Sequence, residues 1–163
     1  MASKILMSAC LLGDKVRYDG NDCLQTHAKL QAWIKAGKVV SICPEMAGGL
    51  PVPRPPAEIE QDKTATMVLA GEAKIRTIGG EDVTKEYITG AQKALALVKQ
   101  HHIQVAILKS RSPSCGVRQI YDGTFSHGLI AGMGLTAQLL SEYGVQVFDE
   151  TEIDLALETA EKT

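Results

Sequence analysis

The sequence predicts an α/β protein with a Rossmann-like, three-layer fold, in which a mostly parallel sheet lies between two layers of helices and carries the site at the carboxyl ends of its strands. Short apolar runs, partly β-branched and bounded by Gly, Pro or polar residues, are typical of buried parallel strands. Four such runs begin at Ile5, Val39, Val105 and Val145. Segments with helical spacing separate them, and this alternation is the pattern of a parallel sheet.

Between the first two strands the sequence predicts a loop and a helix. The Gly- and Asp-rich loop over 11–22 is too long for a simple turn, which makes it a candidate to line a site. Residues 27–36 have apolar side chains at helical spacing and stop at Gly37. Cys23 and His27 lie four residues apart, and we interpret this pair as core packing, because free cysteine is among the most buried residue types.

A proline-rich segment follows the second strand. The fixed φ angles and missing N–H donors of proline exclude a helix or a central strand over 44–58, so we predict a stiff, extended wall that holds Glu45 and Arg54 in place. Residues 64–80 alternate weakly between apolar and polar, which indicates a small hairpin or excursion at the edge of the sheet.

The second half of the chain contains the longest predicted helix, over 84–101, which Asp82 can cap. A Gly-rich, irregular segment over 124–134 leads into a shorter helix. The closing helix begins with Thr151 as its cap and Asp154 three residues later, which is a near capping box.

Length and composition are those of one globular domain. The chain has 163 residues, 45% hydrophobic and 22% charged, which is enough to bury a core, and we expect one domain over 1–163 without a linker. The net charge of -2 and the aromatic content of 4% argue against a nucleic-acid polymer as partner but permit a pocket for one small anion. The longest apolar run is far too short to span a membrane.

The N-terminal residues lead directly into the first expected strand, without the charged, apolar and small-residue succession of a signal peptide. We therefore expect a cytoplasmic protein, and the sequence carries no signal for an oligomeric state. In that compartment the four cysteines are expected to be reduced thiols used for metal binding or catalysis, not a disulfide framework.

Three of these cysteines follow expected strands. Cys10 and Cys43 come directly after the first and second strands, and Cys115 lies in the loop after the third. Ligands of open α/β sheets bind outside the carboxyl ends of the strands, where strand order reverses, so the three thiols could converge. The chain has no C-x-x-C pair, and the spacing is not that of a structural zinc site.

Three thiolates without an obvious fourth protein ligand would leave an open coordination position on zinc. The same count fits a 4Fe-4S cluster with three cysteine ligands and one open iron. Soft thiolates favour such a cluster, and its iron favours a soft sulfur atom in the substrate. Glu45, two residues after Cys43, is close enough to move protons to or from a substrate or water.

Four motifs, in order and over nearly the whole chain, resemble the thiouracil desulfidase (TudS-like) family, formerly known as a domain of unknown function. They are Ser8-Ala9-Cys10-Leu11-Leu12-Gly13, Arg17-Tyr18-Asp19-Gly20, Cys43-Pro44-Glu45 with Gly48-Gly49-Leu50-Pro51 and Pro53-Arg54, and Ser112-Pro113-Ser114-Cys115-Gly116. The resemblance implies a 4Fe-4S cluster held by Cys10, Cys43 and Cys115. It also implies removal of sulfur from a small thiolated pyrimidine, thiouracil or its nucleotide, such as 4-thiouridine monophosphate. Val16 stands where many relatives carry another cysteine.

The mechanism implied is hydrolytic and non-redox. The thiocarbonyl sulfur binds the open iron, water adds to the carbon while Glu45 moves protons, and the sulfur leaves as hydrogen sulfide. Ser112 is the candidate to hydrogen-bond the pyrimidine or the developing charge, and the alternative is a turn hydroxyl that satisfies the backbone before Pro113. Weaker candidates for substrate contacts, including a phosphate, are the basic and hydroxyl side chains Arg17, Arg54, Lys109, Ser110 and Ser114.

Two other functions stay open. A cysteine-nucleophile hydrolase would use Cys115, activated by Lys109 or a helix terminus, and a colourless protein that turns over would favour it. A non-catalytic binding module, in which a zinc ion or a cluster ties three strands together, would lose folding and not only turnover when Cys43 is replaced.

Overall fold

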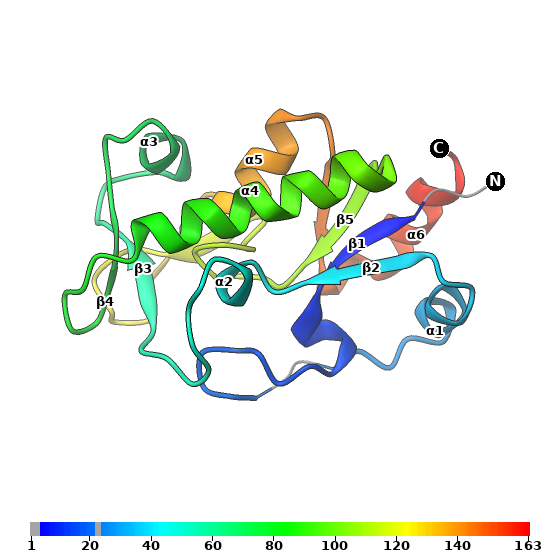
Figure 1. Cartoon of the computed structure of the whole chain (residues 1–163), viewed down its shortest axis with the longest axis horizontal. Coiled ribbons are helices and arrows are strands. Elements are labelled where there is room, and N and C mark those ends of the chain that lie inside the picture. Colours follow the sequence, from blue (N-terminus) through cyan, green and yellow to red (C-terminus); the bar gives the residue numbers. More distant parts are fainter. Residues whose placement is uncertain (1–3, 22–23) are drawn as a thin grey trace.

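The central element of the computed structural model, which describes residues 4–21 and 24–163, is a four-stranded parallel sheet (Figure 1). Its strands are β1 (Ile5–Ser8), β2 (Val39–Ile42), β5 (Val105–Leu108) and β8 (Gln146–Asp149). Their order is β2-β1-β5-β8, and every neighbouring pair is parallel. The predicted fold class and the four predicted strands are confirmed. Cys23, interpreted above as core packing, lies outside the described residues.

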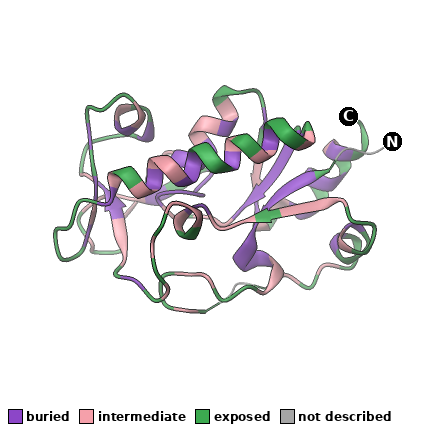
Figure 2. Cartoon of the chain, in the orientation of Figure 1, coloured by how far each residue is buried: buried purple, intermediate pink, exposed green. Residues whose placement is uncertain are grey.

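Helices cover both faces of this sheet. They are α1 (Ala28–Lys35), α4 (Thr84–His101), α5 (Leu135–Glu142) and α6 (Ile153–Glu161). Ile5 and Met7 of β1 pack in one apolar cluster with α1 and α6, whereas Leu6 packs in a second cluster with α4 and α5. The strand is therefore buried on both sides, as Figure 2 shows for β1 and β5. This explains why its sequence is a continuous apolar run and not an alternating one.

The strand order reverses beside β1. The chain passes from β1 outward to β2 and then returns to β5 on the other side of β1. The carboxyl ends of these three strands therefore meet at a switch point, where an α/β sheet forms its ligand crevice. One turn of 3-10 helix, η1 (Ala9–Leu12), continues β1 at this edge, and α2 (Pro44–Ala47) continues β2.

The excursion before α4 is a small unit that packs on the N-terminal half of that helix. It consists of β3 (Ala57–Ile59), α3 (Ala65–Leu69) and β4 (Ile75–Thr77), and β3 pairs antiparallel with β4. A third apolar cluster joins the unit to Tyr87 and Ala91 of α4. The predicted excursion over 64–80 is present, but it contains the helix α3, capped by Thr64, which the sequence analysis missed.

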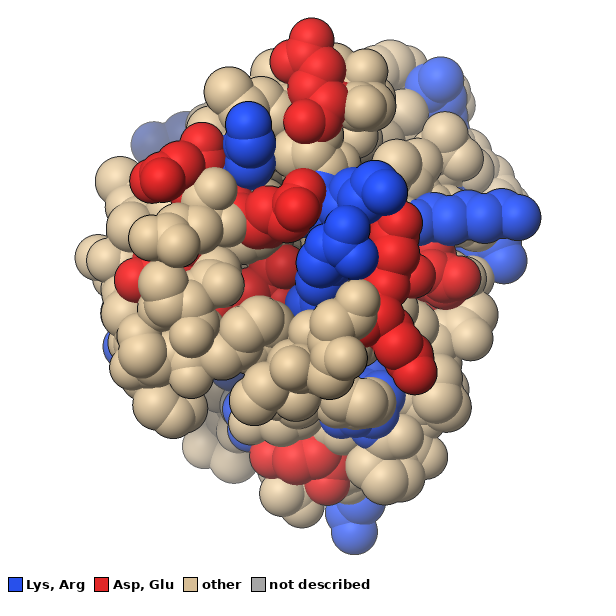
Figure 3. Space-filling model, turned by 90° about the vertical axis from the view of Figure 1, so that its left-hand side faces the viewer, with Lys and Arg blue, Asp and Glu red and all other residues tan. Residues whose placement is uncertain are grey.

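Acidic and basic side chains alternate over this end of the molecule, as Figure 3 shows. Two ion pairs of the unit are Lys74 with Asp82 and Arg76 with Glu60. In the described ranges of the chain, no helix combines the length and the apolar character needed to cross a membrane.

Two segments predicted as irregular contain regular structure. The prediction that proline excludes a helix over 44–58 was wrong at its start, because Pro44 is the first residue of α2 and the first helical position needs no N–H donor. The last two residues of the segment 44–58 belong to β3. The Gly-rich segment over 124–134 contains β7 (Leu129–Ala131), which pairs antiparallel with β6 (Gln119–Tyr121).

The cap of the closing helix also differs from the prediction. A one-turn helix, η2 (Glu150–Glu152), precedes α6, and Asp149, not Thr151, caps η2 in a capping box with Glu152. The N-cap residue of α6 itself is Glu152, which makes no side-chain cap hydrogen bond. The backbone N–H of Thr151 donates to Oδ1 of Asp149 over 2.8 Å. The prediction for α4 is closer, because the Asp82 carboxylate accepts from the backbone N–H of Thr84 at 3.0 Å, in the first turn of that helix.

Candidate active site

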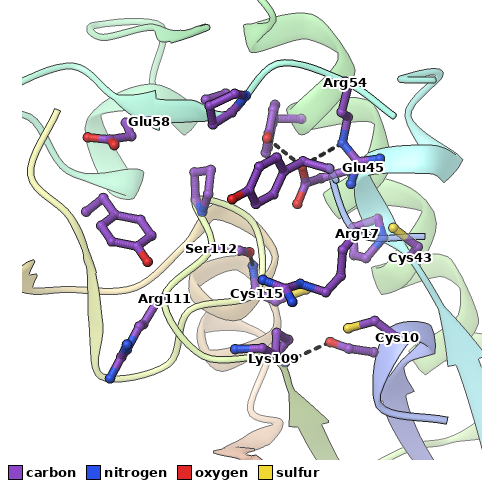
Figure 4. Close-up of a pocket in the computed structure, with 18 of the residues that line it drawn as sticks. Cys10, Arg17, Cys43, Glu45, Arg54, Glu58, Lys109, Arg111, Ser112 and Cys115 are labelled. Carbon is purple, nitrogen blue, oxygen red and sulfur yellow. Dashed lines mark hydrogen bonds and ion pairs between the residues drawn. The ribbon is translucent and has the colours of Figure 1, made fainter. Parts of the chain in front are cut away.

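A pocket of about 340 Å³ opens at the switch point of the sheet, and Cys10, Cys43 and Cys115 all line it. Figure 4 shows the three thiols around one space, with Cys10 and Cys43 on the right and Glu58 and Arg111 on the opposite side. Cys10 and Cys115 are buried, and Cys43 is half-buried. The structure thus brings together three cysteines that are far apart in the sequence, as the strand pattern predicted.

The environment of these thiols favours their neutral form. Burial raises the pKa of Cys115, and the neighbouring Cys43, Cys10 and Glu45 raise it further, against a hydrogen bond with Ser8 that lowers it. Burial likewise raises the pKa of Cys43. A cysteine nucleophile requires the opposite shift, whereas a bound metal centre displaces the proton from a coordinating thiol.

Three cysteine thiols are a donor set that fits an iron–sulfur cluster. In the part of the chain that the structure describes, no three His, Cys, Asp or Glu side chains are grouped closely enough to hold one metal ion. Cys10, Cys43 and Cys115 nevertheless all line one pocket. A donor set of cysteines alone is also the usual one for such clusters.

Glu45 reaches the pocket from the first turn of α2, and its carboxylate is held by two donors. The hydroxyl of Tyr87 donates to Oε1 over 2.6 Å, and Nε of Arg54 donates to the same oxygen over 3.2 Å. The Glu45 side chain is 15% exposed and that of Arg54 is 4% exposed. Glu45 lines the pocket, and among the described residues no hydrogen bond engages its Oε2.

The remaining donors of Arg54 go to backbone carbonyls. Its two terminal nitrogens donate to Pro51 at 3.1 Å and to Val16 at 3.0 Å. The same Val16 carbonyl accepts from the thiol of Cys43 over 3.7 Å. Arg54 therefore connects Glu45, Cys43 and the loop after η1, and its guanidinium is used in orienting these groups. The expected role of the proline-rich segment, to hold Glu45 and Arg54, agrees with these contacts.

Ser112 shapes the loop after β5. Its hydroxyl oxygen accepts from the backbone N–H groups of Ser114 at 3.1 Å and Cys115 at 2.6 Å, so Ser112 has a turn role, but toward the backbone after Pro113 and not before it. Ser112 also lines the pocket. Ser114 does not belong to the pocket lining, because its fully buried hydroxyl points to Thr136 of α5 at 2.8 Å.

Lys109 and Ser110 line the pocket, and both contact Glu150. The sequence analysis did not select Glu150 as a site residue. The Glu150 carboxylate accepts from the backbone N–H of Ser110 at 2.8 Å and from its hydroxyl at 3.0 Å. Nζ of Lys109 pairs with the same carboxylate at 3.2 Å. An acidic residue directly after the fourth strand was the available signal, since β8 lies beside β5.

Two further arginines line the pocket, and among the described residues neither of them pairs with a carboxylate as Arg54 does. The guanidinium of Arg17 lies 6.0 Å from the ring centre of Tyr18, and Figure 4 shows this side chain extending across the space between the thiols. Arg111 also lines the pocket and has a left-handed backbone, with φ of 73°. Such strain in a residue other than glycine is concentrated at functional sites. The sequence analysis did not single out Arg111.

The far end of the pocket is made by the loop between β6 and β7. Phe125 and His127 line it, and both have positive φ values, 56° and 64°. The buried Glu58 holds this loop, because its Oε1 accepts from the backbone N–H groups of Gly123 at 2.8 Å and Phe125 at 3.2 Å. Nothing in the sequence pairs Glu58 with a loop more than sixty residues away.

The chain is similar to known proteins in both sequence and fold. The model of the family described as 2-thiouracil desulfurase matches residues 5–152. YbbK, an uncharacterized protein of Bacillus subtilis (strain 168), is 45% identical over 150 residues, which are 92% of this chain and 97% of that protein. The solved structure of a protein named the 4Fe-4S-dependent thiouracil desulfidase TudS superposes with a TM-score of 0.90 and 40% identity, over 99% of each chain.

Proposed function

Because the chain belongs to the 2-thiouracil desulfurase family, we propose that it is a desulfidase that removes sulfur from a small thiolated pyrimidine with the help of an iron–sulfur cluster. The membership confirms the resemblance predicted from the four sequence motifs. The observation that supports this activity best is the pocket itself, in which three thiols from three strand ends face a carboxylate with one unengaged oxygen.

In this proposal Cys10, Cys43 and Cys115 would hold a 4Fe-4S cluster. When bound, the cluster supplies a Lewis-acidic iron with an open position, which favours a sulfur ligand and polarises a carbon–sulfur bond. The protein's part is to keep the three thiols at one edge of the sheet and to bury two of them, Cys10 and Cys115.

Glu45 is the proposed proton carrier. Its Oε2 takes a proton from the water that adds to the thiocarbonyl carbon, and the protons of that water end on the departing sulfur. The overall change replaces C=S by C=O and converts one water molecule into one hydrogen sulfide, so no oxidant or reductant is consumed. Ser112 can still donate its hydroxyl hydrogen to the pyrimidine, because its described bonds use only the oxygen as acceptor.

The substrate we favour is a nucleotide, such as 4-thiouridine monophosphate. Arg17 and Arg111 are the proposed phosphate contacts, since Arg54 and Lys109 already pair with carboxylates and carbonyls of the protein. Ser110 bonds to Glu150, and we assign it no substrate contact. A compact, partly buried pocket with a few cations suits one small anion.

The test is anaerobic purification with iron and sulfide analysis, followed by a spectrophotometric assay on thiouracil and 4-thiouridine monophosphate. Replacing Cys10, Cys43 or Cys115 by Ala should remove the iron. Glu45→Gln should retain the iron and lose about 10² to 10⁴-fold in kcat. Glu72→Gln makes the same chemical change at an exposed position and should have no effect.

The same experiment separates the two alternatives. A nucleophilic hydrolase would turn over without iron, but the raised pKa of Cys115 opposes that chemistry. A binding module would lose its folded state in Cys43→Ala and would have no turnover to lose in Glu45→Gln. Full activity of Glu45→Gln would remove Glu45 from the mechanism.

A further inference from the structure

We infer that Tyr87 is a positioning residue for the reaction: it fixes the carboxylate of Glu45 so that Oε2 faces the substrate. The inference rests on the proposed function, in which Glu45 moves protons. It concerns a residue that none of the four motifs contains, since Tyr87 lies in the long helix α4, between Cys43 and Cys115 in the sequence.

The contact between the two side chains is short and secluded. The Tyr87 hydroxyl donates to Oε1 of Glu45 over 2.6 Å. Tyr87 is 2% exposed, and its ring packs in the apolar cluster that joins α4 to the excursion. A hydrogen bond to a charged acceptor away from water is among the stronger kinds in proteins.

The backbone around this contact is equally fixed. Helices α2 and α4 touch at Gly48 and Gly90, where an added Cβ would lie 1.9 Å from a backbone carbonyl oxygen of the other helix. Gly90 is one turn beyond Tyr87, and Gly48 is one turn beyond Glu45. The two helices therefore bring the phenol and the carboxylate together without freedom to slide.

The direction of the hydrogen bond is defined as well. Burial raises the pKa of Tyr87 well above its usual range, and the charge of Glu45 and its hydrogen bond with Tyr87 raise it further. The phenol therefore keeps its proton at working pH and acts as the donor. With Arg54 on the same oxygen, two donors fix the plane of the carboxylate and direct Oε2 away from both.

The experiment compares Tyr87→Phe with wild type in the cluster-loaded enzyme. Removing only the hydroxyl should lower kcat roughly tenfold or more, as expected for a hydrogen bond to a charged group, and should change KM by less than about twofold, because the substrate loses no contact. Iron content should stay at the wild-type level. Tyr143→Phe makes the same change at an exposed position and should leave kcat unchanged.

A double-mutant cycle tests whether Tyr87 acts through Glu45. In the Glu45→Gln background, Tyr87→Phe should cause little further loss of kcat, because the group that it positions is gone. If Tyr87→Phe lowers kcat by the same factor in both backgrounds, or raises KM alone, Tyr87 does not act through Glu45 and the inference is wrong. If Glu45→Gln is fully active, the proposed function of Glu45 fails first, and this outcome is distinct from a failure at Tyr87.

A second readout needs no cluster. In iron-free protein with glutamate labelled with ¹³C in the carboxyl group, the resonance missing from Glu45→Gln identifies Glu45. That resonance should move in Tyr87→Phe and stay in place in Tyr143→Phe. An unmoved resonance would mean that the hydroxyl and the carboxylate are not bonded in solution, and it would overturn the inference whatever the kinetics.

Discussion

The contact of α2 with α4 makes a strong prediction for Gly90→Ala. An alanine Cβ at this position would lie 1.9 Å from the carbonyl oxygen of Pro44, where real Cβ contacts are essentially never under 3.0 Å. The Pro44 oxygen belongs to the backbone of α2, and the new Cβ would be attached directly to the backbone of α4. No side chain can therefore rotate to relieve the clash. The two helices would have to separate by roughly 1 Å.

The size of the effect follows from two opposing terms. Overpacking of a filled interior costs about 1–3 kcal/mol, and a clash between backbones belongs at the upper end. Alanine is a better helix residue than glycine by about 1 kcal/mol. The free energy of unfolding should therefore fall by about 2 kcal/mol, which lowers Tm by about 4–8 °C for a chain of this length.

Thermal unfolding of the iron-free protein measures this loss, and iron analysis after reconstitution measures its effect on the site. Pro44 lies between Cys43 and Glu45, so the shift of α2 should also reduce iron content and turnover. Gly79→Ala is the matched control, because its nearest neighbouring atom, Oγ1 of Thr77, would be 3.8 Å away. A Gly90→Ala protein with the Tm and iron content of wild type would refute the packing argument.

Three further predictions follow from contacts of the described residues. Asp149→Ala removes the capping box before α6, and Tm should fall by about 2–4 °C for the loss of about 1 kcal/mol; an unchanged Tm would mean that water replaces the cap. Glu150→Ala removes the acceptor of the Ser110 N–H and hydroxyl and the carboxylate that pairs with Lys109, which keeps only its contacts with Ser110, so urea unfolding should give a free energy lower by about 1–3 kcal/mol. Equal stability would show that this network contributes nothing. Arg17→Ala should raise KM for 4-thiouridine monophosphate and not for thiouracil, and equal KM changes for both would remove Arg17 as a phosphate contact.

The parts of the fold that the sequence predicted are those with a long or fully buried pattern. The four strands are continuous apolar runs because both faces of the sheet are covered, and α4 is long enough for its apolar stripe to repeat. The three cysteines could be placed in one pocket because the carboxyl ends of neighbouring parallel strands share an edge.

The missed elements are short and owe their structure to contacts that sequence patterns do not show. The helix α3 has five residues, and β7 has three. Helix α2 was excluded because proline was treated as a breaker along the whole segment, although Pro44 occupies the one position where a helix tolerates it.

In the site, too, the contacts between residues far apart in the sequence could not be predicted from sequence patterns. Glu45 could be chosen from its place beside Cys43, but its orientation depends on Tyr87 and Arg54, which lie 42 and 9 residues away. Arg54 and Lys109 were grouped with Arg17 as cations, and only the folded chain reveals that the first two are paired with Glu45 and Glu150. The sequence around a cationic residue does not show whether its side chain pairs with a carboxylate of the protein or faces the pocket.

Helix α4 has a consequence for how small molecules enter and leave. Its first half packs on the excursion that carries one wall of the pocket, and its second half packs on the sheet that carries the other. Because these 18 residues form one uninterrupted helix, the two walls cannot open like hinged lobes. We therefore expect substrate entry and product release to depend on loops and side chains at the rim of the pocket.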